Sequence, residues 1–583
     1  MNASKPMSAA CRVELFSKKN VTVFCDQFES RNFARHLASI KSLQADSRAF
    51  YVMDVSRVNA LLDIWQNVLP RVRPFYAVNC NADDVLLGVL ADRVDVGLQC
   101  RTRENVKKAL EYVAPERVLY ANACWTRSTA AYACATRVRR VSFESASDLT
   151  RLLGAVASTK SEIELILNVC VNTALKDDDE DVGCYADEDV EASFGCALAD
   201  AAELIRLAAE MGSPCAGLAF HIGQGGTPAR YQRAIAKMAA LFGVARDIGA
   251  PMRILNLGGD FCTSGNALDF AEICEQINHS LDVHFPPNEF PNLEIIATPG
   301  RFIAESAFAL ITNVVGRRRA SDSSGTRERP TNQSFLVGND LKIISRVSDE
   351  GHSGHRNISA GLLGISTYEA GAARERGPDF DINSDAYIYE TNESYYGSFG
   401  CQINANCNPR CAPLFDYFTD GYAYSAVSGP TTGDERFDLL ETRCRLPTSL
   451  RVGDWLLWEN MGAYTLNNCD DDDASSFGYG ETKFGGIKRP SIFYFTSQRD
   501  WDRLIGAAPT DEQPKPSSPT LFETREVIEN HMTMELYPPW TAAYFDDADD
   551  SSDEGIRSAS PSSLADSDEE ELSPFGEFLS FLL

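Results

Sequence analysis

Short apolar segments alternate with segments of helical periodicity between residues 74 and 300. In the helical segments, apolar residues recur at the spacing of one helix face. Eight strand-like segments alternating with helices predict an α/β fold, a (β/α)8 barrel of the TIM type. The strands are expected at 74–78, 94–99, 117–122, 140–145, 163–169, 216–222, 253–259 and 293–300, and helices at 55–69, 103–113, 196–212 and 228–248.

The ends of these strands are where a site is expected. In a (β/α)8 barrel, functional side chains project from the carboxyl ends of the strands. Polar residues and glycines therefore matter most where a predicted strand stops. These positions are Asn79, Gln99, Asn122, Asn168, His221, the run Gly258-Gly259-Asp260 and the run Thr298-Pro299-Gly300-Arg301.

After residue 301 the pattern changes to strand-like stretches separated by turn residues, which predicts an all-β domain. The stretches are FALITNVV, DAYIYET, YYGSFGC, VGDWLLWEN and PSIFYFTS. A polar insertion and a Pro/Ser/Asp/Glu-rich tail have the composition of disordered segments. We expect an N-terminal segment that adds a strand to the β-domain (1–46), the barrel (47–304), the β-domain (305–317 and 386–505), a partly disordered insertion (318–385) and a disordered acidic tail (506–583).

The charge of the chain is strongly acidic and uneven. The 583 residues carry a net charge of −29, and the segment from Asp546 to Glu577 holds twelve acidic residues against one arginine. A negative surface repels phosphate groups, so nucleic acid and anionic membranes are disfavoured as partners. The shorter acidic runs elsewhere are typical of solvated loops.

Cysteines and histidines form no metal motif in the sequence. Seventeen cysteines are scattered without a CxxC pair, which favours reduced thiols over a disulfide framework or a zinc site. His352 and His355 stand in a Ser/Gly-rich stretch with no cysteine nearby, so we predict no metal site there. Because no apolar run could span a bilayer and no apolar leader opens the chain, we expect a cytoplasmic protein.

Nine local stretches, taken in order, resemble the eukaryotic ornithine decarboxylase family. They are PFYAVNCN, ERVLYANAC, FHIGQGG, NLGGDF, TPGRF, YYGSF, SGPTTGD, VGDWLLWENMGAYT and KRPSIFYF. The family uses pyridoxal phosphate and includes the catalytically silent antizyme inhibitors. The resemblance implies a barrel that holds the cofactor and active sites completed across a dimer interface by the partner's β-domain.

On the cofactor side, three positions depart from what the resemblance implies. Asn79 stands where the family has the lysine that forms a Schiff base with the cofactor. Thr298 replaces the acid expected against the pyridine nitrogen, where a carboxylate keeps the ring protonated. Asp260 occupies the third place of an expected triple-glycine turn at the cofactor phosphate. We therefore expect no bound pyridoxal phosphate.

The substrate side is also altered, whereas part of the cofactor cradle is retained. Thr432 and Gly433 replace a Cys-Asp pair, and Ala405 falls where another substrate-binding aspartate is expected. Because these groups serve different catalytic steps, a single compensating change cannot restore them. The retained residues, vestigial in this interpretation, are His221, Gly223, Gly258, Gly259, Gly300, Arg301 and Tyr464.

We interpret the chain as a catalytically inactive homologue that regulates polyamine metabolism by protein–protein interaction. An antizyme inhibitor binds antizyme in place of the active enzyme, and this is the first interpretation. A second is an inhibitory heterodimer partner of an active ornithine decarboxylase, because both composite sites would be damaged. A third is an active pyridoxal phosphate-dependent ornithine decarboxylase, producing putrescine, with relocated chemistry.

Antizyme recognition in the family maps to the segment that matches residues 122–150. Ala131 and Ala135 stand where the family has polar residues thought to matter for that contact. The segment is nevertheless basic in an acidic protein, which suits an acidic partner surface. The candidate partner-binding residues are Arg127, Arg137, Arg139 and Arg140.

Overall fold

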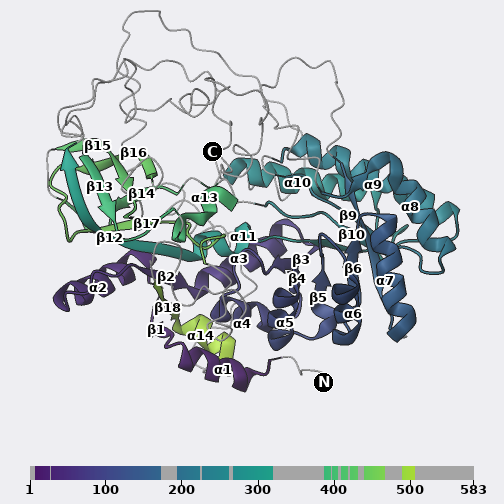
Figure 1. Cartoon of the computed structure of the whole chain (residues 1–583), viewed down its shortest axis with the longest axis horizontal. Helices are drawn as coiled ribbons and strands as arrows, with labels where there is room; N and C mark the ends of the chain where they lie inside the picture. The colour runs from purple at the N-terminus through teal and green to yellow at the C-terminus, as the bar shows by residue number, and fades with distance from the viewer. Residues whose placement is uncertain are drawn as a thin grey trace, which may run out of the picture.

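Eight parallel strands close into a barrel in the computed structural model (Figure 1). Their order is β6-β5-β4-β3-β11-β10-β9-β7, and a pairing of β6 with β7 closes the ring. Each strand overlaps one of the eight predicted from sequence, so the predicted barrel is confirmed. The strands are β3 (Val72–Ala77), β4 (Gly97–Cys100), β5 (Val118–Tyr120), β6 (Arg140–Phe143), β7 (Glu164–Cys170), β9 (Gly217–Phe220), β10 (Ile254–Asn256) and β11 (Glu294–Ala297).

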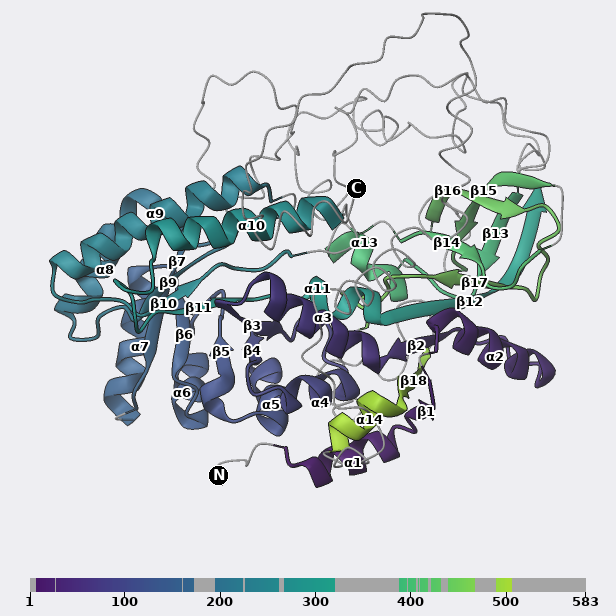
Figure 2. The same cartoon turned by 180° about the vertical axis from the view of Figure 1, so that it is seen from behind.

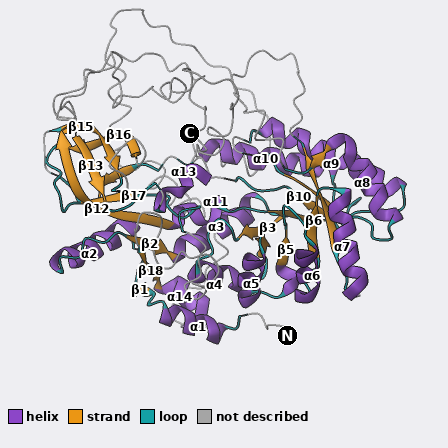
Figure 3. Cartoon of the chain, viewed as in Figure 1, coloured by secondary structure: helices purple, strands orange, loops and turns teal. Residues whose placement is uncertain are grey.

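Helices surround the barrel strands (Figure 3). Several begin at a polar residue whose side chain accepts a backbone N–H of the first turn, such as Asp83, Thr102 and Thr227. Each of the four predicted helices is present within a few residues of its expected range. The barrel helices are α3 (Val55–Val68), α4 (Asp84–Asp92), α5 (Arg103–Tyr112), α6 (Arg127–Thr136), α7 (Ala146–Thr159), α8 (Leu198–Glu210), α9 (Pro228–Asp247) and α10 (Ala267–His284).

A buried apolar layer fills the barrel below its carboxyl-terminal mouth. Phe75, Leu119, Ile166, Ala219, Ile254 and Ile296 form this layer. Gly97, which pairs with Phe75, has no room for a side chain because a Cβ there would collide with the Phe75 ring. The barrel interior is therefore a packed core, and space for a ligand remains only above it.

A second sheet lies beside the barrel (Figure 2). Its strands come from both ends of the described chain, because β1 and β2 precede the barrel and the others follow it. Further helices are α1 (Ala9–Lys18), α2 (Ser30–Leu43), α11 (Arg301–Ala304), α13 (Cys401–Asn404) and α14 (Gln498–Ile505). The strands are β1 (Thr22–Phe24), β2 (Phe50–Asp54), β12 (Phe308–Arg319), β13 (Tyr387–Thr391), β14 (Cys411–Pro413), β15 (Tyr422–Ser428), β16 (Leu439–Pro447), β17 (Trp455–Trp458) and β18 (Ser491–Ser497).

Two expectations about this part of the chain are wrong. The stretch that opens our predicted barrel at residue 47 contributes β2 to the second sheet, where it pairs with β12 on one side and with β18 on the other. The stretch YYGSFGC is no strand. It forms a 3-10 turn (Ser398–Gly400) that continues into α13. The buried carboxylate of Glu393 accepts the N–H of Ser398 at 2.9 Å and thereby supplies a local partner for the turn backbone.

The second sheet is fastened to the barrel mouth by buried contacts. The Asn81 side chain donates to the carbonyl of Gly462 at 2.9 Å, and the N–H of Gly462 donates to the carbonyl of Glu305 at 3.1 Å. The hydroxyl of Tyr494, on β18, donates to Asp83 at 2.8 Å. These contacts hold the segment before Tyr464 over the barrel.

The structure describes thirteen stretches of the chain, and within them no helix is long and apolar enough to cross a membrane. The predicted insertion beyond Arg319 and the acidic tail lie outside them. The described residues are 7–26, 28–159, 161–171, 194–223, 226–261, 267–319, 387–395, 397–404, 407, 409–417, 421–430, 439–466 and 489–505.

Candidate functional site

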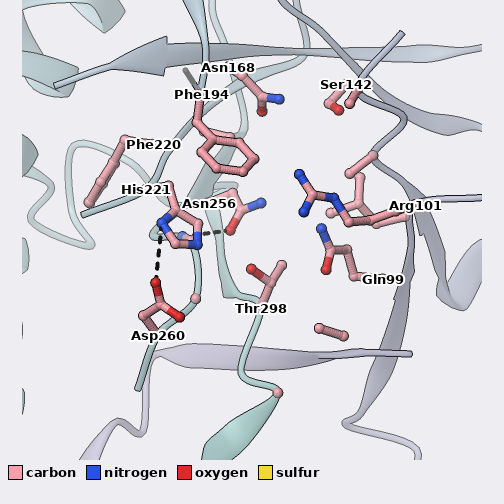
Figure 4. Close-up of a pocket in the computed structure, with 18 of the residues that line it drawn as sticks. Gln99, Arg101, Ser142, Asn168, Phe194, Phe220, His221, Asn256, Asp260 and Thr298 are labelled. Carbon is pink, nitrogen blue, oxygen red and sulfur yellow. Dashed lines mark hydrogen bonds and ion pairs between the residues drawn. The ribbon is translucent and has the colours of Figure 1, made fainter. Parts of the chain in front are cut away.

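A cavity opens at the carboxyl-terminal mouth of the barrel, where the strand-end rule places a site (Figure 4). Asn122 and Pro299, the other predicted strand-end residues, are not among the lining residues. The side chain of Asn122 instead accepts the N–H of Cys124 at 3.3 Å in the following loop. The predicted strand-end residues that do line the cavity are Asn79, Gln99, Asn168, His221, Gly258, Gly259, Asp260, Thr298, Gly300 and Arg301.

Asn79 lies in the turn that follows β3. The turn is fixed because the N–H of Val78 donates to the carbonyl of Gln99 at 3.0 Å on the neighbouring strand. The Asn79 side chain lines the cavity, yet its Oδ1 is buried and has no hydrogen-bond partner among the described residues. A buried carbonyl oxygen without a partner is costly, so this atom is a place for a donor from a water or a ligand.

The turn after β10 has two residues with left-handed backbone. Gly258 has φ 77° and Asp260 has φ 65°. The side chain of Asn256 accepts the N–H of Gly258 at 2.9 Å, and a Cβ at Gly259 would lie 2.8 Å from the carbonyl oxygen of Thr298. Gly258 and Gly259 therefore serve the backbone turn itself, whereas Asp260 is a non-glycine residue in a conformation that glycine adopts more easily.

His221 faces Asp260 across the cavity edge, with 3.7 Å between Nδ1 and the carboxylate (Figure 4). The N–H of Gly223 donates to the same Nδ1 at 3.1 Å, so this nitrogen carries no proton. Burial lowers the pKa of His221, Asp260 opposes that shift, and Arg101 and Arg301 add to it. The ring is therefore neutral at neutral pH.

Phe194 covers His221 at the mouth of the cavity. The two rings stack with centroids 5.6 Å apart and planes 20° from parallel. The guanidinium of Arg101 lies 4.9 Å from the centroid of Phe194. Sequence patterns give no signal for either residue, because Arg101 follows the polar strand end and Phe194 precedes the short strand β8 (Cys196–Ala197) outside the ring of eight.

The end of β11 meets the segment from the second sheet. Thr298 is buried, and a Cβ at Gly300 would lie 3.0 Å from that of Cys80. The guanidinium of Arg301 lies 5.9 Å from the ring centroid of Tyr464. Tyr464 itself is held by a hydrogen bond from its N–H to the carbonyl of Cys80 at 2.9 Å. The retained residues of the cradle, Gly223 apart, thus all line one cavity.

The wall formed by β6 and β7 adds residues that strand ends alone did not identify. The Asn168 side chain donates to the Glu144 carboxylate at 2.9 Å. Ser142 is buried, and its hydroxyl has no hydrogen-bond partner among the described residues. Both Ser142 and Glu144 line the cavity.

The substrate-side positions lie outside the described residues. These are Ala405, Thr432 and Gly433, and the same holds for His352 and His355. Within the described ranges, no group of three or more His, Cys, Asp and Glu side chains is placed to hold a metal ion.

The four candidate partner-binding arginines separate into two kinds. Arg127 begins α6 and Arg137 follows its last residue, and both are exposed. Arg139 is exposed as well, and its guanidinium forms an ion pair of 2.6 Å with Glu162. Arg140 is different, because its side chain is 13% exposed and forms ion pairs of 3.1 Å with Glu164 and 2.6 Å with Glu294. Arg140 starts β6 at the opposite end of the barrel from the cavity, so it belongs to the ion pairs of the barrel floor rather than to an exposed surface.

The closed barrel, the adjoining sheet and the cavity define the class of pyridoxal phosphate-dependent decarboxylase folds. A solved arginine decarboxylase from Paramecium bursaria Chlorella virus superposes with a TM-score of 0.57 at 24% identity, covering 79% of this chain and 99% of that one. A lysine/ornithine decarboxylase from Vibrio vulnificus gives a TM-score of 0.55 at 18% identity, and the superposition covers 79% of this chain and 97% of that one.

Sequence comparisons find a matching family model and similar proteins of known name. Residues 55–305 match the model of the pyridoxal-dependent decarboxylase, pyridoxal binding domain. The ornithine decarboxylase of Panagrellus redivivus is 28% identical over 499 residues, 85% of this chain and 96% of that one. Antizyme inhibitor 2 of Xenopus laevis is 27% identical over 478 residues, which cover 81% of this chain and 87% of that protein. The barrel of this chain thus matches the pyridoxal binding domain of that family model, and the chain is similar over most of its length to ornithine decarboxylases and antizyme inhibitors.

Proposed function

We propose that this chain is a family member without decarboxylase activity that regulates polyamine metabolism in the cytoplasm by binding antizyme. The observation that carries the first half is Asn79 at the end of β3, inside the cavity, at the position implied for the Schiff-base lysine. A carboxamide nitrogen cannot form an imine with an aldehyde, so this position supplies no covalent link to a cofactor.

Nothing else among the lining residues takes over that role. The lining includes arginine side chains and no lysine in the part of the chain that the structure describes. Asn79 Oδ1 presents a bare acceptor to the cavity. The residues present therefore do not fit pyridoxal phosphate as a covalently bound group.

Two neighbouring positions disfavour the cofactor for independent reasons. Thr298 offers a hydroxyl where an acid would stabilise a protonated pyridine nitrogen. Asp260 adds a carboxylate to the turn expected to receive the phosphate, and like charges about 4 Å apart repel by roughly 4 kcal/mol at an effective dielectric of 20. Restoring a lysine alone would leave both obstacles in place.

The antizyme half of the proposal rests on the relatives and on the exposed face of α6. Antizyme inhibitors 1 and 2 are among the relatives, at 26% and 27% identity. Arg127, Ala131 and Ala135 are exposed and lie one turn apart along α6, and Arg139 follows. Arg139 is paired with Glu162 at 2.6 Å, so a partner carboxylate would have to compete for it. With Arg127, the surface still presents two arginines in a chain of net charge −29, which suits an acidic partner surface.

The test is binding of purified antizyme to the full-length chain. We expect the chain to retain antizyme. An Arg127→Ala/Arg139→Ala double variant should bind antizyme about tenfold more weakly. Each lost charge contact at the interface is worth roughly 0.7 kcal/mol, and the sum of about 1.4 kcal/mol corresponds to a tenfold change in affinity. Arg246→Ala is the matched control, since Arg246 is also exposed but lies on α9. Equal binding by the double variant and the parent would contradict the assigned surface.

An active ornithine decarboxylase is the second bait in the same experiment. Retention of that enzyme with no retention of antizyme would replace the proposal by the inhibitory heterodimer. In that case decarboxylation by the mixture should fall as this chain is added, because each composite site would contain a position such as Asn79 that departs from the active enzyme.

A further inference from the structure

Two cysteines contact each other beside the cavity, in a part of the molecule that the proposed function does not use. Cys401 begins α13 and is 2% exposed, whereas Cys407 is half-buried. The N–H of Cys407 donates to the carbonyl of Cys401 at 3.2 Å. Their thiols are also hydrogen-bonded to each other, so the two sulfur atoms are neighbours.

The surroundings make the two thiols unequal. The hydrogen bond from Cys401 lowers the pKa of Cys407, with Arg301 acting in the same direction against burial and the carboxylates of Glu305 and Asp260. The same hydrogen bond, together with burial, raises the pKa of Cys401. A partly exposed thiol with a lowered pKa next to a buried thiol with a raised pKa is the arrangement of an attacking and a resolving cysteine.

We propose that Cys401 and Cys407 are a reversible redox pair that hydrogen peroxide converts to an intrachain disulfide. The proposal rests on the contact of the two thiols and on their unequal access to solvent. It is independent of whether the chain binds antizyme.

The reaction balances with peroxide as the oxidant. The Cys407 thiolate attacks one peroxide oxygen, the O–O bond breaks, and Cys407 becomes a sulfenic acid while the other oxygen leaves as water after taking a proton. The Cys401 thiol then attacks the Cys407 sulfur, the S–O bond breaks, and a second water leaves. Two thiols and one peroxide thus give one disulfide and two waters, and a dithiol reductant reverses the change.

A second pair of cysteines supplies an internal control. Cys411 and Cys444 lie on β14 and β16, are 5% and 6% exposed, and their thiols are also hydrogen-bonded to each other. Burial raises the pKa of Cys411, so this pair lacks both a partly exposed member and a thiol with a lowered pKa. Proximity alone would oxidise both pairs, whereas the proposal predicts oxidation at Cys401 and Cys407 first.

The experiment uses the reduced full-length chain, treated with hydrogen peroxide and then alkylated. Trypsin cuts after Arg376 and Arg410, so one peptide, 377–410, contains both Cys401 and Cys407 and no other cysteine. After peroxide treatment we expect this peptide to carry no alkyl group and to weigh two hydrogens less than the unalkylated dithiol peptide. After reduction and a second alkylation it should carry both alkyl groups. The peptide that begins at Cys411 should stay alkylated, with at least tenfold slower oxidation.

Two variants separate the roles of the cysteines. Cys401→Ser should stop at a sulfenic acid on Cys407 that dimedone traps, whereas Cys407→Ser should leave Cys401 alkylated. A Cys411→Ser/Cys444→Ser variant should form the disulfide at the parental rate, and thermal unfolding of each variant checks that it is folded. Full alkylation of peptide 377–410 in the peroxide-treated parent chain would overturn the proposal, as would equal oxidation of the two pairs.

Discussion

Replacing Asp260 by asparagine should lower the pKa of His221 further. The carboxylate lies 3.7 Å from Nδ1 of His221 and is the group that raises the pKa of the ring against burial. Asparagine has nearly the same size and tolerates the left-handed backbone at φ 65°, so the substitution removes the charge and keeps the turn.

The size of the effect follows from this distance. Two unit charges 3.7 Å apart attract by about 4 kcal/mol at an effective dielectric of 20. The His221 side chain is 34% exposed and solvent screens the pair, so we expect a fraction of that value, about 1.4 kcal/mol, or about one pH unit. Protonation of His221 would also break the hydrogen bond that Nδ1 accepts from Gly223.

The same shift changes how stability depends on pH. Burial already lowers the pKa of His221 below its ordinary value of 6.5, so the unfolded chain binds a proton first as the pH falls. Stability conferred by the neutral ring is therefore complete above pH 6.5 and declines as the pH falls toward the folded pKa. Removing the Asp260 charge extends this window downward, so the variant should lose about 1.4 kcal/mol more than the parent at acidic pH.

The assay is an NMR titration of the histidine ring protons, with the His221 signal identified by its absence in His221→Gln. Asp247→Asn, at the exposed last residue of α9, is the control and should leave the signal unmoved. An unchanged or raised pKa of His221 in Asp260→Asn would refute the electrostatic coupling of Asp260 to the ring, whereas a parental pKa of His221 above 7 would refute the neutral ring that we infer.

Three further substitutions test the barrel and its junction by urea unfolding. Arg140→Ala should cost about 2 kcal/mol, because it removes charged hydrogen bonds to Glu164 and Glu294 on the barrel floor and leaves these carboxylates with Arg253 and Arg73 alone. A loss under about 0.5 kcal/mol would contradict the structural role assigned to Arg140. Arg137→Gly should stabilise the chain by roughly 0.5 kcal/mol, because Arg137 caps the end of α6 with φ 61°, a backbone conformation that glycine adopts more easily than arginine. Destabilisation by this substitution would contradict the left-handed conformation of the cap. Gly462→Ala should cost more than about 3 kcal/mol, because a Cβ there would collide with the carbonyl oxygen of Ala304, and a neutral effect would contradict the close junction of sheet and barrel.

The barrel was predictable because each strand is a short apolar run flanked by helices of clear periodicity. The stretch 50–54 has the same apolar character, but composition cannot tell which of two sheets takes a strand buried on both faces. YYGSFGC looked like a strand by its aromatic residues, and the turn depends on the buried Glu393 carboxylate, a contact invisible to a pattern.

The pattern of strands predicted those residues of the candidate site that stand at the carboxyl ends of barrel strands, and no others. The strand-end rule identified Asn79, His221 and Asp260, whose side chains all meet at the cavity. It could not identify Phe194, because that ring reaches the cavity from a loop, nor could it find the contact of Glu144 with Asn168. Arg140 appeared in sequence as one more basic residue, whereas its strand position directs it to the barrel floor.

Loss of catalysis is tested by the release of carbon dioxide from ornithine by the purified full-length chain supplied with pyridoxal phosphate, with an absorbance scan of the same sample. We expect a colourless protein after removal of free cofactor and no release above background, because Asn79 cannot hold the cofactor through a Schiff base. A yellow protein whose absorbance band is lost on borohydride treatment and that releases carbon dioxide would contradict this expectation.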